Sequence, residues 1–521
     1  MAQSTDKTLK QLIINKMPRS VYKAKDAAGE LDPEQVYLPD SAYDDSLGIT
    51  SATPGQIVKV KTVQDGKPTE WEAVNDYPAV QTRYGVRFTG SPPEGERLYG
   101  AVGLKANVGV GAELVENDFD YIMPWAGMKR CNTKLVNGER VPTFYEGEPG
   151  FSNTAADVFV QVPRFYYFRS DDDAEHVVSM YPLAGYRPPE KFRRADGTLR
   201  DYVFLPAYTS ALVDGVPVSR SGLYAYMASL NGWMKLLSDM HAAGKLDSDI
   251  WIEGTKDEDI VRILCDIEFA TRDHQTKMMG ACLMRYADDT VVEGGVNQFT
   301  LSPEIAAKYV IGQAIAIGTA DKGQQIAMNA TITSIDAGVI TFEPSDADVT
   351  VEAGHFVSSM PWKSGACDGV KASSGSPISN SNGIYPCKYR GIENPWGNQF
   401  RWRWDVLVND YVPSVLLDPT KYADGRLTED YHALAYTIPT TAGYAKEMGY
   451  DPEFPFVRIT KELGGTWNSF FADYNWVNAG LRALLVGGGV NGGRGAGLRY
   501  CSVAGAPSSA NWSIGAALSP A

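Results

Sequence analysis

The chain has 521 residues, more than one hydrophobic core ordinarily supports, so two to four domains are expected. Its 63 acidic and 48 basic residues give a net charge of −15, whereas nucleic-acid binders concentrate Lys and Arg, so we expect no DNA or RNA partner. No apolar run approaches the roughly 20 residues that span a bilayer, which predicts no membrane insertion. The first ten residues contain no apolar signal core, and synthesis in a cytosol is expected.

The first 80 residues are predicted to hold two small modules. Residues 1–45 combine a short apolar run, a short helix ending near Gly29, an extended Tyr37–Pro39 and a linker, and this segment is too small to fold alone. Residues 46–80 are predicted to be a β-hairpin module, because residues 55–74 alternate apolar and polar residues on both sides of Asp65-Gly66, after a stretch of linker composition at 41–54.

Residues 81–296 alternate short strand-like runs with Gly, Pro, Asn and Asp turns, and two helices are predicted among them. The stretch 256–271 places Ile260, Ile263, Leu264 and Ile267 at helical spacing behind acidic residues. A second amphipathic pattern covers about Ser221 to Ala243.

Residues 297–360 differ from their surroundings, because alternating β segments are joined there by Asp-Ala-Gly and Glu-Ala-Gly turns. We interpret them as a small inserted β domain, resembling a barrel, and residues 361–521 as the return to the interrupted domain. The composition, with 51 Gly, 28 Tyr and 11 Trp, favours a β-rich and loop-rich architecture.

The usual catalytic and metal signatures are missing from the sequence. The five histidines form no HExxH motif, and there is no GxSxG, Walker loop or strand-coupled GxGxxG. The glycine run 486–497 lacks the Lys-Ser/Thr ending of a phosphate loop. Carboxylates such as Glu268, Asp273, Glu393 and Asp405 are more readily explained as caps or solvated charges than as an acid and base pair. We therefore predict no catalytic residue, no metal and no cofactor.

Two groups of residues leave alternatives open. Six scattered cysteines predict buried free thiols, and Cys367 with Cys387, which flank a Gly/Ser-rich loop, are the one pair worth testing for a disulfide. Trp396, Trp402 and Trp404 could stack on a sugar, but the Trp402-Arg403-Trp404 alternation favours a strand with its Trp side chains in the core and its Arg outward.

Two blocks of sequence resemble a known family. RGIENPWGNQFRWRWD (390–405) combines Glu-Asn-x-x-Gly-Asn with an aromatic strand, and residues 482–519 combine Val-Gly-Gly, Ala-Gly and Ile-Gly with Asn/Ser-rich stretches. Together they resemble the C-type lectin fold of the formylglycine-generating-enzyme type, as used by phage receptor-binding proteins and by variable proteins of diversity-generating retroelements. The pieces 117–132, 162–168, 182–192 and 267–276 fit the phage members in the same order.

The resemblance implies an α+β, β-rich and loop-rich fold: a C-type lectin-like domain with a small β insertion, preceded by an N-terminal virion-docking segment and the β-hairpin. Its members diversify Asn codons near the C-terminus. Here Asn491 and Asn511 remain, and the other aligned places hold Gly489, Val490, Gly492, Arg494, Gly495, Ser502, Ala504, Gly505, Ser509 and Ser513. Either a mutated variable region or a static Gly/Ala/Ser-rich loop explains this composition.

Receptor contact is expected in this terminal part, between the apolar strands at Leu484–Val486 and Ile514–Leu518. Small residues there surround isolated Arg and Tyr anchors, and Arg499 with Tyr500 is predicted to be a surface pair whose removal leaves melting nearly unchanged. The alternative is that the glycines permit tight turns and the arginines cap carbonyls. The predicted ligand-binding residues are Gly489, Val490, Asn491, Gly492, Arg494, Gly495, Arg499, Tyr500, Ser502, Ala504, Gly505, Ser508 and Ser509.

The function that the resemblance implies is a structural protein of a phage tail or head fibre, assembled into virions in the host cytoplasm. Its expected partners are other virion proteins, through residues 1–40, a bacterial surface receptor that is a protein or a glycan, and two further copies in a homotrimer. One alternative is an oxidase like the enzymes of the parent fold, which use a copper-binding cysteine pair, although only Cys501 lies in the corresponding part of this chain. Another is a stabilising capsid decoration protein.

Overall fold

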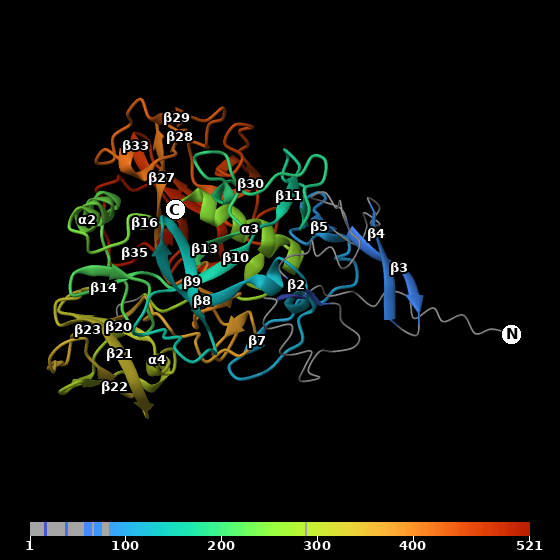
Figure 1. Ribbon diagram of the computed structural model, residues 1–521. Helices are drawn as coiled ribbons and strands as arrows, with labels where there is room; N and C mark the ends of the chain where they lie inside the picture. Colours follow the sequence, from blue (N-terminus) through green and yellow to red (C-terminus); the bar gives the residue numbers. More distant parts are fainter. Residues whose placement is uncertain (1–14, 18–36, 40–56, 65–66, 75–82, 287–288) are drawn as a thin grey trace. The chain divides into compact units, whose positions relative to one another are not determined.

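A computed structural model describes residues 15–17, 37–39, 57–64, 67–74, 83–286 and 289–521, and the chain divides into two compact units, 1–82 and 83–521 (Figure 1). In the first unit, β1 (Asn15–Met17) pairs with β2 (Tyr37–Pro39) in parallel. Strands β3 (Ile57–Gln64) and β4 (Lys67–Val74) pair antiparallel with Gln64 opposite Lys67, which is the predicted hairpin pairing. The predicted turn at 65–66 and the helix ending near Gly29 lie outside the described residues.

Helix α3 (Thr255–Phe269) lies in the middle of the second unit (Figure 1), and all its residues except Lys256 are buried. It begins where the Gly254 N–H donates to the Asp257 carboxylate at 2.9 Å, and it ends at Ala270 in the left-handed region at φ 49°. Its apolar side chains enter the largest hydrophobic cluster with Trp125 and Trp396. The predicted helix at 256–271 is therefore confirmed.

Helix α2 (Leu230–Ala242) is shorter than predicted, because residues 221–229 are not helical. Ser229 ends the preceding extended segment, and its hydroxyl accepts a hydrogen bond from the Gly232 N–H at 3.0 Å. This N-cap fixes the start of the helix at Leu230, nine residues after the predicted start at Ser221. Leu223 and Met227 therefore belong to a loop, although their spacing resembles that of a helix.

Two four-stranded antiparallel sheets pack around α3. One has the order β13-β10-β8-β9 and the other the order β11-β12-β5-β6. The strands of the first are β8 (Lys129–Val136), β9 (Glu139–Tyr145), β10 (Val158–Pro163) and β13 (Tyr202–Pro206). Those of the second are β5 (Arg83–Arg87), β6 (Glu96–Tyr99), β11 (Tyr166–Arg169) and β12 (Glu175–Ser179).

Short strands add both local hairpins and pairings between distant segments to the second unit. Strand β16 (Ile250–Ile252) pairs with β36 (Leu518–Pro520), and β14 (Ala211–Val213) pairs with β15 (Val216–Val218). A further sheet has the order β26-β25-β24-β7. Its strands are β7 (Gly109–Val110), β24 (Gly375–Ser376), β25 (Lys388–Tyr389) and β26 (Ile392–Glu393).

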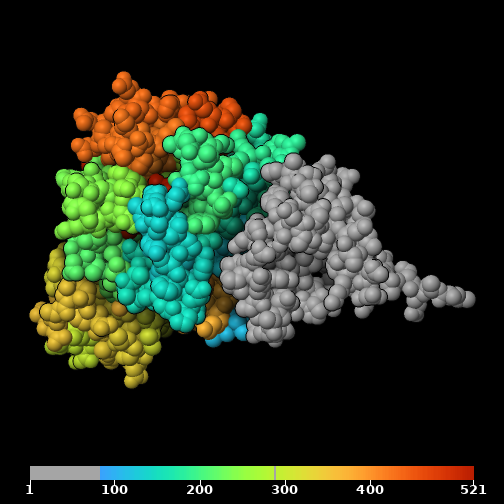
Figure 2. Space-filling model, viewed as in Figure 1, coloured from blue at the N-terminus to red at the C-terminus, as the bar shows by residue number. Residues whose placement is uncertain are grey.

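Residues 289–360 form a seven-stranded sheet in the order β17-β23-β20-β21-β22-β19-β18, with the short helix α4 (Pro303–Ala306). The sheet has its own apolar cluster, which includes Phe299, Ile315 and Phe342. Figures 1 and 2 show it in yellow, across the second unit from the orange strands near residue 410. Its strands are β17 (Asp289–Thr290), β18 (Glu293–Gly294), β19 (Gln298–Thr300), β20 (Ala314–Gly318), β21 (Ala327–Asp336), β22 (Val339–Glu343) and β23 (Phe356–Met360).

The largest sheet has nine strands, in the order β29-β28-β27-β33-β34-β32-β30-β31, with β35 added beside β27. Strands β33 and β34 pair antiparallel, whereas β32 and β34 pair in parallel. Its strands are β27 (Phe400–Asn409), β28 (Val412–Leu416), β29 (Tyr431–Ala433), β30 (Gly443–Met448), β31 (Thr460–Leu463), β32 (Tyr474–Val477), β33 (Leu481–Gly487), β34 (Gly497–Val503) and β35 (Ile514–Gly515).

The predicted α+β, C-type lectin-like fold is wrong for this chain. Strands take 35% of the residues and helices only 12%, and the strands are shared among several separate sheets, one of them a half-barrel. The coarser expectation of a β-rich architecture agrees with the structure. The sequence blocks that suggested the fold determine local turns and buried strands, but they do not determine the order in which distant strands pair.

Two of the three tryptophans belong to the core, as the alternation favoured, and Trp404 packs against it partly buried. Trp396 and Trp402 are fully buried, and the indole N–H of Trp402 donates to the Ala228 carbonyl at 3.0 Å. The expectation of an outward Arg403 is wrong, because its guanidinium is buried and forms ion pairs with Glu253 and Glu258 at 3.0 and 3.1 Å. All six cysteines are free and buried, so Cys367 and Cys387 form no disulfide.

Candidate functional site

The terminal segment, defined as residues 489–514, runs between two strongly anchored strands. Leu484, Leu485 and Val486 of β33 are buried, as are Ile514 and Leu518, and this confirms the predicted apolar ends. Strand β33 before the segment and β35 at its end both pair with β27, so the backbone on both sides of the segment is held by sheet hydrogen bonds. Side chains that face outward from the loops of this segment can therefore change without altering the anchors, whereas the buried core face of β34 is part of the fold.

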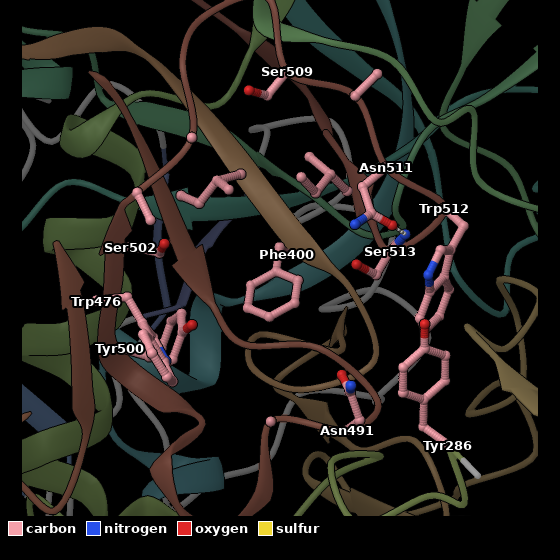
Figure 3. Close-up of a pocket in the computed structure, with 16 residues that line it drawn as sticks. Tyr286, Phe400, Trp476, Asn491, Tyr500, Ser502, Ser509, Asn511, Trp512 and Ser513 are labelled. Atoms are coloured by element: carbon pink, nitrogen blue, oxygen red, sulfur yellow. Dashed lines mark hydrogen bonds between the residues drawn. The ribbon is translucent and has the colours of Figure 1, made fainter. Parts of the chain in front are cut away.

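A hollow of about 580 Å³ lies over this segment (Figure 3). Seven of the thirteen predicted ligand-binding residues line it: Asn491, Gly492, Tyr500, Ser502, Ala504, Gly505 and Ser509. The other lining residues are Tyr286, Phe400, Trp476, Leu485, Ala510, Asn511, Trp512, Ser513 and Ile514. Segments far apart in the sequence therefore meet around the hollow.

Aromatic rings form two sides and part of the floor of the hollow (Figure 3). Tyr286 stacks on Trp512 on one side, with ring centroids 4.9 Å apart and an interplanar angle of 30°. Trp476 stands on the other side beside Tyr500, and half of its surface is exposed. Phe400 lies between them, with its ring centroid 5.6 Å from that of Tyr500. Large rigid apolar surfaces are thus available to a ligand from two directions.

The polar groups of the hollow are amides and hydroxyls. The Ser509 hydroxyl accepts from the Ala506 N–H at 3.0 Å, and the Asn511 side-chain oxygen accepts from the Ser513 N–H at 3.3 Å. In these two bonds the side-chain oxygens act as acceptors. The hydroxyl proton of Ser509 and the amide N–H groups of Asn511 can therefore donate hydrogen bonds to a ligand. Asn491 at the rim is exposed and can both donate and accept.

The hollow carries no formal charge. Among the described residues that line it, none is Asp, Glu, Lys, Arg or His. The ammonium of Lys322 lies 5.5 Å from the centre of the Tyr286 ring, but it also pairs with Asp321 at 3.1 Å. The chain as a whole has a net charge of −15, so the absence of charged side chains from the lining distinguishes this surface from the chain as a whole.

Arg499 does not belong to this site, and the expectation of a surface pair with Tyr500 is wrong. Its side chain is 2% exposed and forms an ion pair with Asp266 of helix α3. Burial alone would raise the pKa of Asp266, but Arg499 and hydrogen bonds from His176 and His274 outweigh it and hold that pKa well below its ordinary value. Arg499 is therefore part of a buried charge network beneath β34.

The remaining predicted residues also lie away from the lining. A side chain at Gly489 would meet the Phe400 ring at 2.7 Å, and one at Gly495 would meet the Tyr474 Cβ at 2.7 Å. Val490 is fully buried. The Arg494 guanidinium lies 5.0 Å from the Trp467 ring and 3.4 Å from the Asp273 carboxylate. Ser508 is exposed, but it is not part of the lining.

The aromatic residues of the hollow were not predicted from sequence. Trp512 lies inside the terminal block, beside Asn511, and its position there is the signal that could have identified it. Trp476 lies on β32, which pairs with β34 and places Trp476 opposite Ser502. Tyr286 comes from the segment before the inserted sheet, and only the tertiary fold brings it to Trp512.

Buried carboxylates outside the hollow have structural partners. Glu393 accepts hydrogen bonds from the N–H groups of Gly365 and Cys367, and Asp405 accepts from the Thr255 N–H and hydroxyl. Burial raises the pKa of Glu393 to about 7 and that of Asp405 to about 6. Neither residue lines the hollow. Asp405 caps the first turn of α3, as interpreted, whereas Glu393 is buried and holds the turn at 364–369, so the interpretation as a helix cap or solvated charge is wrong for Glu393.

Over the described part of the chain, no cluster of three or more His, Cys, Asp or Glu side chains has the geometry to hold a metal ion. No helix among the described residues is both long and apolar enough to span a membrane. No family model and no curated protein sequence matches this chain. The family relationship suggested by the motifs therefore stays a prediction.

Proposed function

We propose that this chain is a structural protein of a phage virion and that its second unit binds a receptor on the bacterial surface. The observation that carries the proposal is the hollow of about 580 Å³ formed by the terminal segment. The sequence blocks at 390–405 and 482–519 support the phage origin, and the hollow supplies the binding surface. Ligand sites in proteins are typically concave, largely apolar hollows of this size with a few convergent polar groups.

The hollow combines rigid side chains with adaptable ones. Trp476, Trp512 and Tyr286 offer large contact areas at a low cost in conformational entropy, and Asn491 and Ser509 offer hydrogen bonds of either sense. The same mixture of aromatic and small polar residues is typical of antibody loops. A protein that must recognise a cell surface needs this combination more than it needs a catalytic group.

The alternative of an oxidase finds no support at Cys501. Its thiol is buried, lies 2.5 Å from the Asn475 side-chain oxygen, and has its pKa raised to about 11 by burial. A nucleophilic or metal-binding cysteine requires an accessible thiolate, which burial in an apolar environment disfavours.

Binding of the purified full chain to bacteria that the phage infects tests the proposal. Gly505 lines the hollow, and its nearest neighbours, Ser509 and Trp402, lie 3.6 Å from an added Cβ, so Gly505→Phe should fill the space. The matched control is Gly369→Phe, an exposed position with open space around it. We expect at least tenfold weaker cell binding for Gly505→Phe only, and wild-type protein should block phage adsorption. Binding that survives Gly505→Phe would place the site elsewhere, and wild-type protein that does not block adsorption would favour a decoration protein.

We further propose that residues 1–40 attach the chain to the particle and that it assembles as a homotrimer. Most of that segment lies outside the described residues, and the compact second unit begins at Arg83. A chain lacking residues 2–40 should remain soluble and bind cells but should be absent from purified particles. Three linked sites would raise avidity by about 10²–10⁴, which favours a trimer for binding to a cell surface. The mass of the chain in solution tests this, and a monomeric mass would contradict the trimer.

A further inference from the structure

The aromatic surface of the hollow continues beyond its rim. The ring of Trp476 lies 5.1 Å from that of Tyr474 on the same strand, and Tyr474 lies 5.0 Å from Tyr444 on the neighbouring strand β30. All three rings are at least partly exposed. A path of aromatic rings therefore leads from the hollow across the sheet, and it suits a ligand with several repeating units.

The neutral lining restricts the chemistry of that ligand. A phosphate, sulfate or carboxylate leaving water for this hollow would find no cationic partner among the lining residues, and burying an unpaired charge is costly. The Lys322 ammonium, which lies 5.5 Å from the centre of the Tyr286 ring, already forms an ion pair with Asp321. An acidic ligand is therefore disfavoured relative to an uncharged one.

The available contacts match a sugar ring. A pyranose presents a flat face of C–H groups, which packs on an aromatic ring, and an edge of hydroxyls, which both donate and accept hydrogen bonds. The hollow offers Trp476 and Trp512 for such faces, and Asn491, Asn511 and Ser509 for such edges. A protein receptor would instead require an interface of about 800 Å² on each partner, with charged groups at its rim.

We propose that the ligand is an uncharged carbohydrate chain, with one sugar ring in the hollow between Trp476 and Trp512 and the following rings along Tyr474 and Tyr444. This inference rests on the proposed receptor-binding function and adds the chemical class of the receptor. The terminal segment then holds the sugar in the hollow, and strands β30 and β32 carry the extension.

The test compares two treatments of the bacteria and one matched pair of variants of the full chain. Periodate cleaves the vicinal diols of sugars, and a protease removes surface proteins. Trp476→Ala removes the exposed ring at the hollow, while Trp467→Ala removes a ring of equal exposure, 50%, that is not part of the lining. Trp476→Tyr restores a ring and guards against a purely structural effect, and circular dichroism checks that each variant is folded.

We expect periodate to abolish cell binding and protease to leave it unchanged. Trp476→Ala should weaken binding at least tenfold, Trp476→Tyr should recover most of it, and Trp467→Ala should have no effect. Raising NaCl from 0.1 to 0.5 M should change the affinity less than twofold, because screening weakens only charged contacts. Oligosaccharides prepared from the neutral surface polysaccharide of the same cells should compete better as they lengthen, and Tyr444→Ala should remove that gain.

Binding that survives periodate and is lost after protease would overturn the carbohydrate while leaving the receptor-binding function intact. A strong loss of affinity in salt would overturn the uncharged character of the ligand. Equal losses for Trp476→Ala and Trp467→Ala would overturn the placement at the hollow. Wild-type chain that binds none of the bacteria which the phage infects would overturn the proposed function itself, and these four results are distinguishable.

Discussion

The two faces of strand β34 have different roles: one face packs into the core, and the other lines the hollow. Successive side chains of the strand belong to these two faces in turn. Arg499, Cys501 and Val503 point into the core, whereas Tyr500 and Ser502 line the hollow. Successive side chains of a strand point to opposite faces, so two neighbouring residues cannot both contact one ligand. Residues that face the hollow and residues that stabilise the core are therefore separated by a single position along the chain.

The core face of β34 is held by charges rather than by apolar packing alone. The Arg499 guanidinium pairs with Asp266, and the backbone N–H of Arg499 donates to the Asp473 carboxyl group at 2.6 Å. Removing one partner of a buried ion pair leaves the other charge unpaired away from water. Tyr500 and Ser502 on the hollow face are also mostly buried, but they are uncharged, so a substitution there leaves no unpaired buried charge. Four predictions test this difference.

The largest expected effect is the loss of stability on removing Arg499. Arg499→Ala leaves Asp266 buried without its guanidinium, and we expect the free energy of unfolding of the second unit to fall by about 3–5 kcal/mol. Denaturant unfolding measured by tryptophan fluorescence gives this change. Arg494→Ala is the control: it loses a longer, partly exposed contact with Asp273 and should cost at most about 1 kcal/mol. Equal losses for the two variants would contradict the separation of the faces.

A smaller loss is expected where a methyl group is added on the core face. A Cβ at Gly497 would overlap the buried Asp473 carboxylate, so Gly497→Ala should cost about 1–3 kcal/mol through overpacking. Gly369→Ala, at an exposed position with open space around it, provides the control, and it should change stability by less than about 0.5 kcal/mol. The two unfolding midpoints measure the difference, and a neutral Gly497→Ala would mean that Asp473 can move aside.

The pH dependence of stability should report Asp473 beneath the same strand. Burial raises its pKa to about 8 in the folded state, against about 3.9 in the unfolded chain. Between these values the folded state binds more protons, so this carboxyl group stabilises the fold at low pH and its contribution is lost as the pH rises toward 8. Glu393 and Asp405, whose pKa values are also raised, act in the same direction.

Asp473→Asn should therefore reduce the fall in stability between pH 5 and 8 by up to about 1.4 kcal/mol per pH unit. Unfolding midpoints measured across that range provide the test. A slope identical to that of the wild-type chain would show that Asp473 is not protonated in the folded state. Cell binding at pH 6, where both chains are folded, should be the same, because Asp473 does not line the hollow.

Local features were the most predictable from the sequence. The spacing of Ile260, Ile263 and Ile267 identified helix α3. The alternation around Trp402 identified a strand with Trp402 in the core, although it wrongly placed Arg403 outward. Both patterns report periodicity along one element, which is a property of neighbouring residues. The helix predicted from Ser221 failed because the Ser229 cap, a single-residue signal, outweighs apolar spacing.

The site was predictable in part. The terminal segment was identified because small residues between apolar strands indicate a supported loop, and seven of its residues line the hollow. Arg499 was misplaced because the alternation of a strand was not applied to it. Tyr286 and Trp476 were missed because strand order in the nine-stranded sheet and the position of the inserted sheet are long-range properties. The overall fold failed for the same reason.

The smallest expected effect is at the rim of the hollow. Asn491 is exposed, so Asn491→Ala should change the free energy of unfolding by less than about 0.5 kcal/mol. Loss of one hydrogen bond to a ligand costs about 0.5–1.5 kcal/mol, and we therefore expect cell binding to weaken by about two- to twelvefold. Ser508→Ala is the control, because Ser508 is exposed on the same segment but does not line the hollow. Surface titration of bacteria with each variant measures the difference, and equal binding by both variants would remove Asn491 from the contact. Such a change in binding without a change in stability is the behaviour expected of the hollow face of β34 and its neighbouring loop, and it is the reverse of that expected for Arg499.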